Sequence, residues 1–399
     1  MTSPGFVLSK IPIVLAALVA IYWLKFKPEI DLTGLTHLPL KNNEKCRVLH
    51  DIRATEDIAI DNSAGIAYVG SASETTRFTN FPGLGRHNHT LPRPFDGLDP
   101  YREDLFVFDL ETEKFSKLNI VNYADDQDLI VHGTALRSFA PGVNTLYIVN
   151  HKRTGSVISI FKHKVGSPNI EHVRDVKTRH IYIPNSVTVI DETHILVTND
   201  HGFYNGPLRR AEDLTGFKHL STVALCEIRD FSQTNSKGLK CKIVARGLSY
   251  ANGIEYIEKS NRVAVCETLS GMVQFYKYDG TKKTLTYEKE VRSGGALDNV
   301  KLIPGTNDLV LATFADPGST LGYIHHGLDF KGPVAMLATV LKEKDNYEKP
   351  IVGFHDSAEK LGGFGFMTGV VFVPKAGKML GGSCSKEGLL VCDIDYANV

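Results

Sequence analysis

Short aliphatic runs separated by polar turns recur along most of the chain. Six units each combine two such runs, which are rich in Val, Ile, Tyr and Phe and lack the spacing of an amphipathic helix. The units comprise residues 65–70 with 105–110, 144–150 with 156–161, 193–200 with 221–228, 261–267 with 272–278, 307–313 with 321–326, and 377–383 with 388–394. This repetition predicts an all-β fold, and six repeats favour a six-bladed β-propeller. In such a fold the starts of the inner strands meet at one end of a central channel.

Pairs of acidic, amide or small polar residues accompany these runs at five distant places. The pairs are Glu56-Asp57, Asn185-Ser186, Asn199-Asp200, Asn252-Gly253 and Asp298-Asn299. Calcium binds six to eight carboxylate, amide and carbonyl oxygens, and a propeller channel is a place where distant strands supply them. Each pair taken alone is also an ordinary turn dipeptide. Their recurrence therefore predicts a calcium site in the channel.

Composition excludes several other functions. Lys plus Arg and Asp plus Glu each number 45 in the 399 residues, so no overall field favours binding to nucleic acid. The six cysteines include no CxxC motif, which argues against a zinc or redox-dithiol site.

The N-terminal residues predict that the protein enters the secretory pathway. Residues 11–24 are apolar or aromatic and have lysines on both sides, which is typical of a signal peptide or a short membrane anchor. We favour an uncleaved anchor and divide the chain into an anchor over residues 1–27, a linker over 28–44 and a propeller domain over 45–399. A lumenal or extracellular domain, or a secreted one, is the corresponding location.

Other features fit that compartment but leave alternatives open. Asn88 begins a glycosylation sequon, although such triplets are common by chance. Cys46 and Cys392 lie near the two ends of the predicted domain, either as a disulfide that closes the ring or as two buried thiols. The stretch from Glu74 to Arg102 is either a cover over the site or a solvated linker.

Seven phrases in the chain carry a family resemblance. They are TEDIAI, VHG, YIVNH, IPNS, VTNDHGF, YANGI and ALDN, in that order. From Cys46 to Cys392 the chain thereby resembles the calcium-dependent paraoxonases, also called arylesterases or lactonases. The resemblance implies a six-bladed propeller with two channel calcium ions, an N-terminal anchor and a Cys46–Cys392 disulfide.

The resemblance also implies a role for each site residue. Matched by position, the ligands of the catalytic calcium are Glu56, Asn185, Asn252, Asp298 and Asn299. His132 and His151 match the histidine pair, in which one ring takes a proton from the attacking water; structural packing is the alternative. His201 either assists them or fixes a turn.

A second, structural calcium is in doubt. Its ligands would be Asp57, the backbone carbonyl of Thr134 and the residue at position 186, where the family has aspartate and this chain has Ser186. The missing negative charge predicts a weak or vacant second site.

The sequence thus predicts a calcium-dependent hydrolase of lactones and aryl esters, in which calcium polarises the carbonyl that water attacks. Its partners would be a small lactone or ester and, through the N-terminal segment, a membrane. Two alternatives are a non-catalytic calcium-stabilised propeller and a propeller enzyme of the gluconolactonase or strictosidine-synthase-like type.

Overall fold

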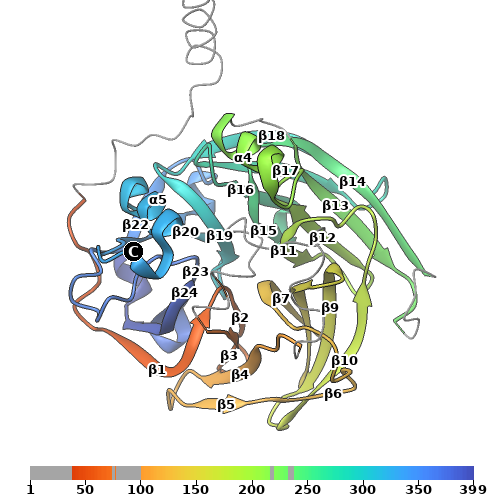
Figure 1. Ribbon diagram of the computed structural model, residues 1–399, viewed down its shortest axis with the longest axis horizontal. Coiled ribbons are helices and arrows are strands. Elements are labelled where there is room, and N and C mark those ends of the chain that lie inside the picture. Colours follow the sequence, from red (N-terminus) through yellow and green to blue (C-terminus); the bar gives the residue numbers. More distant parts are fainter. Residues whose placement is uncertain (1–37, 74–76, 78–99, 216–219, 232–237) are drawn as a thin grey trace, which may run out of the picture.

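The protein is a six-bladed β-propeller, as predicted. The computed structural model describes residues 38–73, 77, 100–215, 220–231 and 238–399, and Figure 1 shows its six sheets arranged around a centre. The inner strands are β2 (Ile58–Asp61), β7 (Val131–Ala140), β11 (Pro184–Val189), β15 (Ala251–Ile257), β19 (Ala296–Leu302) and β23 (Gly369–Val373). Each begins at the channel and is followed outward by strands of its own blade.

The remaining strands extend each blade outward. They are, blade by blade, β3 (Ile66–Ser71), β4 (Asp104–Asp109) and β5 (Phe115–Lys117); β8 (Val143–Lys152), β9 (Gly155–Lys164), β10 (Asn169–Val176) and β6 (Asn119–Val121); β12 (His194–Asn199), β13 (Ser221–Ile228) and β14 (Leu239–Leu248); β16 (Arg262–Glu267), β17 (Met272–Asp279) and β18 (Thr284–Arg292); β20 (Leu309–Phe314), β21 (Met336–Leu341) and β22 (Pro350–Asp356); and β24 (Lys378–Asp393) with β1 (Cys46–Thr55). Neighbours pair antiparallel, except that β6 pairs parallel with β10. Antiparallel pairing explains why short turns join most of these strands.

The ring closes by pairing the first strand with the last. β24 pairs with β23 through its first half and with β1 through its second half. Cys46 lies opposite Cys392 in that ladder and forms a disulfide with it, which confirms this pairing. A second disulfide, Cys226–Cys241, joins β13 to β14 and was not predicted.

The hydrophobic core lies between adjacent blades. One cluster combines Val149 and Ile158 of the second blade with Val187, Val197 and Ala224 of the third. Because both faces of such strands are covered, they consist of continuous apolar runs rather than alternating ones. Full burial of each aliphatic side chain contributes roughly 1.5–3 kcal/mol.

Two helices depart from the all-β prediction. Residues 321–326 were expected to form a strand but belong to α5 (Pro317–His326), and β21 is the strand that follows β20. Asp316 caps this helix by accepting a hydrogen bond from the backbone N–H of Gly318, and proline occupies the first turn. The other helix, α4 (Gly206–Thr215), lies in the connection between β12 and β13 of the third blade.

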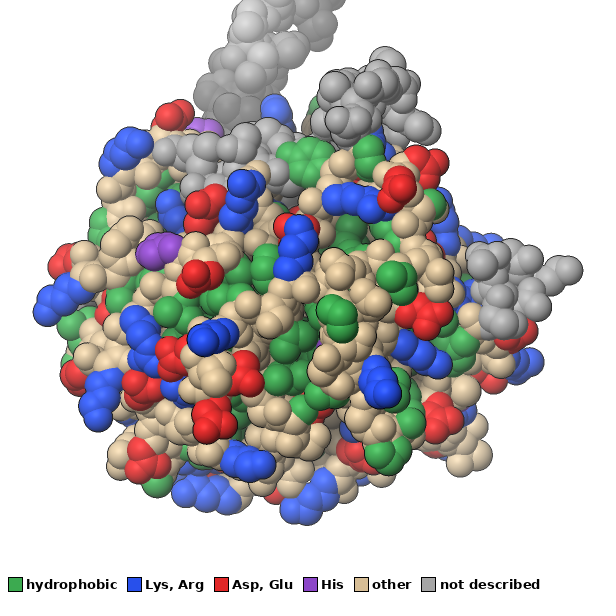
Figure 2. Space-filling model, turned by 90° about the horizontal axis from the view of Figure 1, so that it is seen from below, with side chains coloured by type: hydrophobic (Ala, Val, Ile, Leu, Met, Phe, Trp, Pro, Cys, Tyr) green, Lys and Arg blue, Asp and Glu red, His purple; other side chains and the backbone are tan. Residues whose placement is uncertain are grey.

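The remaining N-terminal predictions lie outside the described residues. These are the anchor over 11–24, the Asn88 sequon and most of the stretch from Glu74 to Arg102. Within the described residues, no helix has the length and hydrophobicity needed to cross a membrane. Acidic and basic side chains are interspersed over the face seen in Figure 2, as the balanced composition suggests.

Candidate metal and catalytic site

The predicted site residues lie where the inner strands begin. Glu56 and Asp57 immediately precede β2, and the others lie in the first residues of their strands: Asn185 and Ser186 in β11, Asn252 in β15, and Asp298 and Asn299 in β19. All are buried. Since the inner strands surround the channel (Figure 1), their starts converge at one end of it.

A β-bulge sets the direction of the side chains in four of these strands. In β11, Pro184 pairs with Asn199 and Val187 with Val197, so two residues of β11 oppose one of β12. The same register shift occurs at residues 132–133 of β7, 252–253 of β15 and 298–299 of β19. A bulge redirects side chains locally and is common next to active sites. Three of the five polar pairs of the sequence, Asn185-Ser186, Asn252-Gly253 and Asp298-Asn299, are therefore bulges and not turns.

Four oxygens in this cluster are buried without a hydrogen-bond partner. They are Glu56 Oε2, Asn185 Oδ1, Asn252 Oδ1 and Asn299 Oδ1. The amide nitrogens of the same side chains are engaged: Asn299 Nδ2 donates to Glu56 Oε1 at 2.7 Å, and Asn252 Nδ2 donates to Thr268 Oγ1 at 3.2 Å. Buried acceptors without donors are costly, and a cation would satisfy them.

Charge also favours a cation at this place. Burial, together with the carboxylates of Asp57 and Asp298, raises the pKa of Glu56 well above its ordinary value. Burial and the charges of Asp57 and Asp200 likewise raise the pKa of Asp298. Two carboxylates and three amides thus form a donor set that fits calcium. Among the described residues no three His, Cys, Asp or Glu side chains form a metal cluster by themselves, so the amides are essential to this set.

The predicted histidines form a buried chain beside the cluster. His132 Nδ1 lies 2.8 Å from His151 Nε2, and His151 Nδ1 lies 2.8 Å from the hydroxyl of Ser156. The other nitrogen of His132 lies 3.7 Å from Glu56 Oε1. Burial lowers the pKa of His132 to about 3, so this ring is neutral at neutral pH.

His201 lies in a separate group of charges. Its ring nitrogens are 3.1 Å from Asp200 and 3.0 Å from Asp213 of α4. Burial disfavours the charged ring, but the two aspartates raise the pKa of His201. Asn185 Nδ2 reaches Asp200 at 3.5 Å, so this group borders the candidate ligands.

The donor set for a second calcium does not fit a metal ion. The side chain of Lys301, in β19, places its ammonium 2.7 Å from Asp57 Oδ2 and 2.6 Å from the carbonyl oxygen of Thr134. Those are two of the three atoms assigned to that ion, and Ser186 brings no charge. The sequence did not indicate Lys301, because the bulge at residues 298–299 interrupts the alternation of side chains along β19.

A buried ion pair that the sequence analysis also missed holds the start of β7. Arg77 and Glu103 are 2.9 Å apart, with side-chain exposures of 0% and 1%. Both contact the backbone of Val131, which precedes His132. Neither residue belongs to a periodic apolar run of the sequence that would have identified it.

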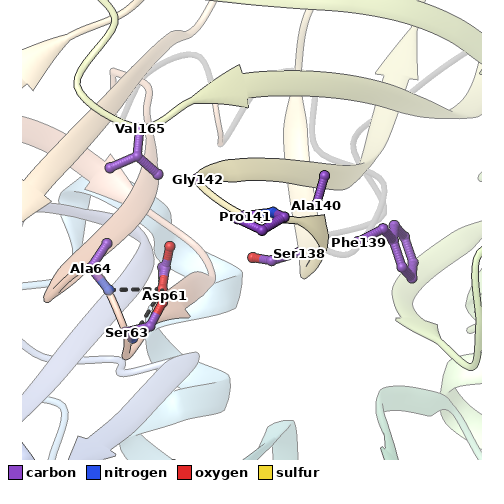
Figure 3. A pocket seen from close by; sticks show the side chains of 9 residues that line it. All are labelled: Asp61, Ser63, Ala64, Ser138, Phe139, Ala140, Pro141, Gly142 and Val165. Atoms are coloured by element: carbon purple, nitrogen blue, oxygen red, sulfur yellow. Dashed lines mark hydrogen bonds between the residues drawn. The ribbon is translucent and has the colours of Figure 1, made fainter.

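One of the described cavities lies away from this site. It has a volume of about 430 Å³ and is bordered by the turns after β2 and β7, at the strand ends opposite the candidate ligands (Figure 3). Asp61 accepts hydrogen bonds there from Ser63, Ala64 and Asn144. The Asp61 carboxylate therefore stabilises the turn after β2.

Comparison with known proteins relates the chain to a family of hydrolases. A family model described as arylesterase matches residues 94–333, more than half of the chain. Serum paraoxonase/lactonase 3 of Homo sapiens is 23% identical over 284 residues, which cover 70% of this chain and 72% of that protein. Serum paraoxonase/arylesterase 1 of Homo sapiens is 25% identical over 269 residues, covering 66% and 67%.

A solved structure of similar shape is that of the major allergen Mala s 1 of Malassezia sympodialis. It matches with a TM-score of 0.53 and 11% sequence identity over 90% of this chain and 97% of that chain. At this identity the similarity shows the fold alone.

Proposed function

Because this chain belongs to the arylesterase family, we propose that it hydrolyses lactones and aryl esters in a calcium-dependent reaction. The names of its relatives, which include lactonase and arylesterase, support both substrate classes. One observation carries the proposal. Four buried oxygens without hydrogen-bond partners, from four blades, lie at one end of the channel, where the carboxyl groups of Glu56 and Asp298 both have raised pKa values.

Glu56, Asn185, Asn252, Asp298 and Asn299 would hold the ion. When bound, calcium supplies the Lewis acidity that polarises a substrate carbonyl. Hydrogen bonds orient the ligands: Asn299 Nδ2 donates to Glu56 Oε1 and to the carbonyl of Thr368, so its own oxygen points away from both. The bulges and these bonds keep the acceptor oxygens in place before an ion binds.

The histidine chain is the candidate for proton transfer. In the neutral tautomer that protonates Nδ1, His132 donates to His151 Nε2 and presents its free Nε2 next to Glu56. His151 in turn donates to Ser156, which also accepts a hydrogen bond from Tyr204. His132 Nε2 can therefore accept a proton from a water molecule beside the ligands, while His151 fixes its tautomer.

A substrate panel tests the proposal on the full-length chain. Phenyl acetate and lactones of several ring sizes would be assayed with calcium, with EGTA, and with the Asp298→Asn variant. We expect hydrolysis that EGTA abolishes and calcium restores, and a loss of at least 100-fold in Asp298→Asn but not in the exposed control Asp126→Asn. Calcium binding without turnover of any substrate would refute the enzyme and favour a calcium-stabilised binding propeller.

We propose a secretory or extracellular location for the domain. Two disulfides suit an oxidising compartment, and the names of both human relatives include serum. The membrane anchor over residues 11–24 remains a prediction from the sequence. Glycosidase digestion and protease protection of the expressed full-length chain in microsomes would test this location.

A further inference from the structure

Lys301 occupies a partly buried position on the channel side of β19. Its ammonium contacts Asp57 Oδ2 at 2.7 Å and the carbonyl oxygen of Thr134 at 2.6 Å. The Lys301 side chain is 11% exposed and that of Asp57 is fully buried. Three inner strands, β2, β7 and β19, are thus joined at one point by a positive charge that belongs to the chain.

A calcium ion cannot share this point with the ammonium. Calcium lies about 2.3–2.6 Å from its oxygen ligands, so an ion bound to these two oxygens would require almost the same space. We propose that the Lys301 ammonium takes the place of a second metal ion, and that the channel holds one calcium per chain. This inference rests on the proposed calcium-dependent function.

The formal charges agree with a single ion. Asp200 is also buried nearby but is paired with His201, which leaves the carboxylates of Glu56, Asp57 and Asp298 around the two cation positions. One calcium and one ammonium match their combined charge, whereas Arg77 is already paired with Glu103. Buried charge is tolerated where it is matched in this way.

The hydrogen bonds of Asp57 favour a permanent occupant. Besides Lys301, its carboxylate accepts from the backbone N–H of Ile58 at 2.8 Å and of Thr134 at 2.7 Å. A tethered ammonium cannot dissociate, and its three N–H donors suit a carboxylate and a carbonyl. The junction of β2, β7 and β19 therefore persists when calcium is removed.

Lys301 also lines a cavity that lies away from the candidate metal site. This cavity of about 230 Å³ lies farther along the same strands, and all six inner strands line it. Its walls include Lys301, Leu136, Glu255 and Tyr256. Lys301 therefore contacts Asp57, the neighbour of the candidate ligand Glu56, and also lines this cavity.

The decisive measurement is the number of calcium ions per full-length chain. The chain would be equilibrated with calcium and dialysed, and the bound ion would be counted by elemental analysis. We expect one ion. Two ions would overturn the role of Lys301 and leave the proposed function intact, whereas zero would overturn both.

Variants test whether Lys301 is what excludes the second ion. The double variant Lys301→Gln with Ser186→Asp lacks the ammonium and gains a carboxylate at position 186, so we expect it to bind two calcium ions. The single variant Ser186→Asp keeps the ammonium, so we expect it to bind one. A double variant that binds only one would contradict the inference. If it fails to fold, the wild-type count still decides.

A stability readout addresses the junction without calcium. In EGTA, we expect Lys301→Met to raise the unfolding equilibrium constant at least tenfold. The exposed control Lys282→Met should leave it unchanged. Equal stability of both variants and the wild type would show that the ammonium does not hold the three strands.

Discussion

Glycine allows the inner strands to approach closely enough for their site residues to meet. A Cβ on Gly133 would lie 2.5 Å from the carbonyl oxygen of Asn185, and one on Gly253 would lie 2.5 Å from the nitrogen of Val300. A Cβ on Gly369 would lie 2.5 Å from the carbonyl oxygen of Glu56. Each contact is shorter than real carbon atoms tolerate, so the narrow channel depends on glycine at these positions.

Gly253→Ala tests this dependence. The added carbon must push apart β15 and β19, which carry Asn252 and Asn299, so we expect calcium affinity to fall at least tenfold and stability to fall by about 1–3 kcal/mol. Calorimetric titration and urea unfolding would measure both. Gly280→Ala, where the new carbon would meet nothing closer than 3.7 Å, is the control and should change neither.

His132→Gln tests the proton-transfer role. Glutamine keeps a polar side chain of similar size but cannot accept a proton from water, so kcat should fall by about 100-fold or more. Calcium affinity should change little because His132 is not among the candidate ligands. His325→Gln, on the exposed side of α5, is the control. A variant with normal kcat would leave the histidine chain a structural role only.

At this scale the sequence predicts which residues meet but not what each one contacts. The polar pairs indicate a channel site, because carboxylates and amides beside aliphatic strands are uncommon in a core. The family resemblance selects Glu56, Asn185, Asn252, Asp298 and Asn299 among them. The sequence does not show that three of the pairs are bulges, because a bulge depends on the register with the neighbouring strand. The register of β19 also decides which groups the Lys301 ammonium contacts, so its contacts with Asp57 and Thr134 could not be predicted from the sequence.

At the scale of elements, strands are predictable where both faces are buried. The continuous apolar runs of β8, β12, β16 and β20 identify them directly. Residues 321–326 mislead because their short mixture of aromatic and aliphatic residues suits a strand equally well. What decides for α5 is the cap at Asp316 and the proline after it, and such end signals outweigh a short run.

The outer strand β10 contains one partly buried carboxylate that accepts several hydrogen bonds. Asp175 accepts hydrogen bonds from Lys152 at 2.5 Å and Ser159 at 2.7 Å, and contacts His172 at 3.0 Å. Burial alone would raise its pKa, yet His172 and Lys152 lower the pKa of Asp175 to about 2. A depressed pKa contributes stability that is present above the unfolded value, about 4, and is lost as pH falls through the folded value.

Asp175→Asn should therefore destabilise the protein by about 2 kcal/mol at pH 7, and roughly half of that difference should remain at pH 3. Urea unfolding of wild type and variant across this range would measure it. Asp126→Asn, on the surface, is the control at each pH. A difference that stays constant down to pH 3 would show that the contacts act without ionisation of Asp175.

At the scale of the whole molecule, the propeller must hold its first and last strands together. Both lie in one sheet, so β1 completes the blade begun by β23 and β24, and the Cys46–Cys392 bond fixes that ladder. The repeats predicted the number of blades because they are a long-range signal. The two terminal cysteines left a disulfide and two buried thiols as alternatives, and the family resemblance implied the disulfide. The second bond, Cys226–Cys241, has a separation of 15 residues and lies within one blade, where no topological argument singles it out.

The two disulfides should differ in what they contribute, because one closes a ring and the other a hairpin. Constraint of the unfolded chain grows with the enclosed loop, and separations of 346 and 15 residues correspond to about 6 and about 3 kcal/mol. We expect Cys46→Ala with Cys392→Ala to lower the free energy of unfolding more than Cys226→Ala with Cys241→Ala, as measured by urea unfolding. The hairpin pair is the matched control, since all four replaced sulfurs lie in β-ladders. Equal losses would mean that strand pairing alone keeps the ring closed, and that the terminal bond adds no more than any local cross-link.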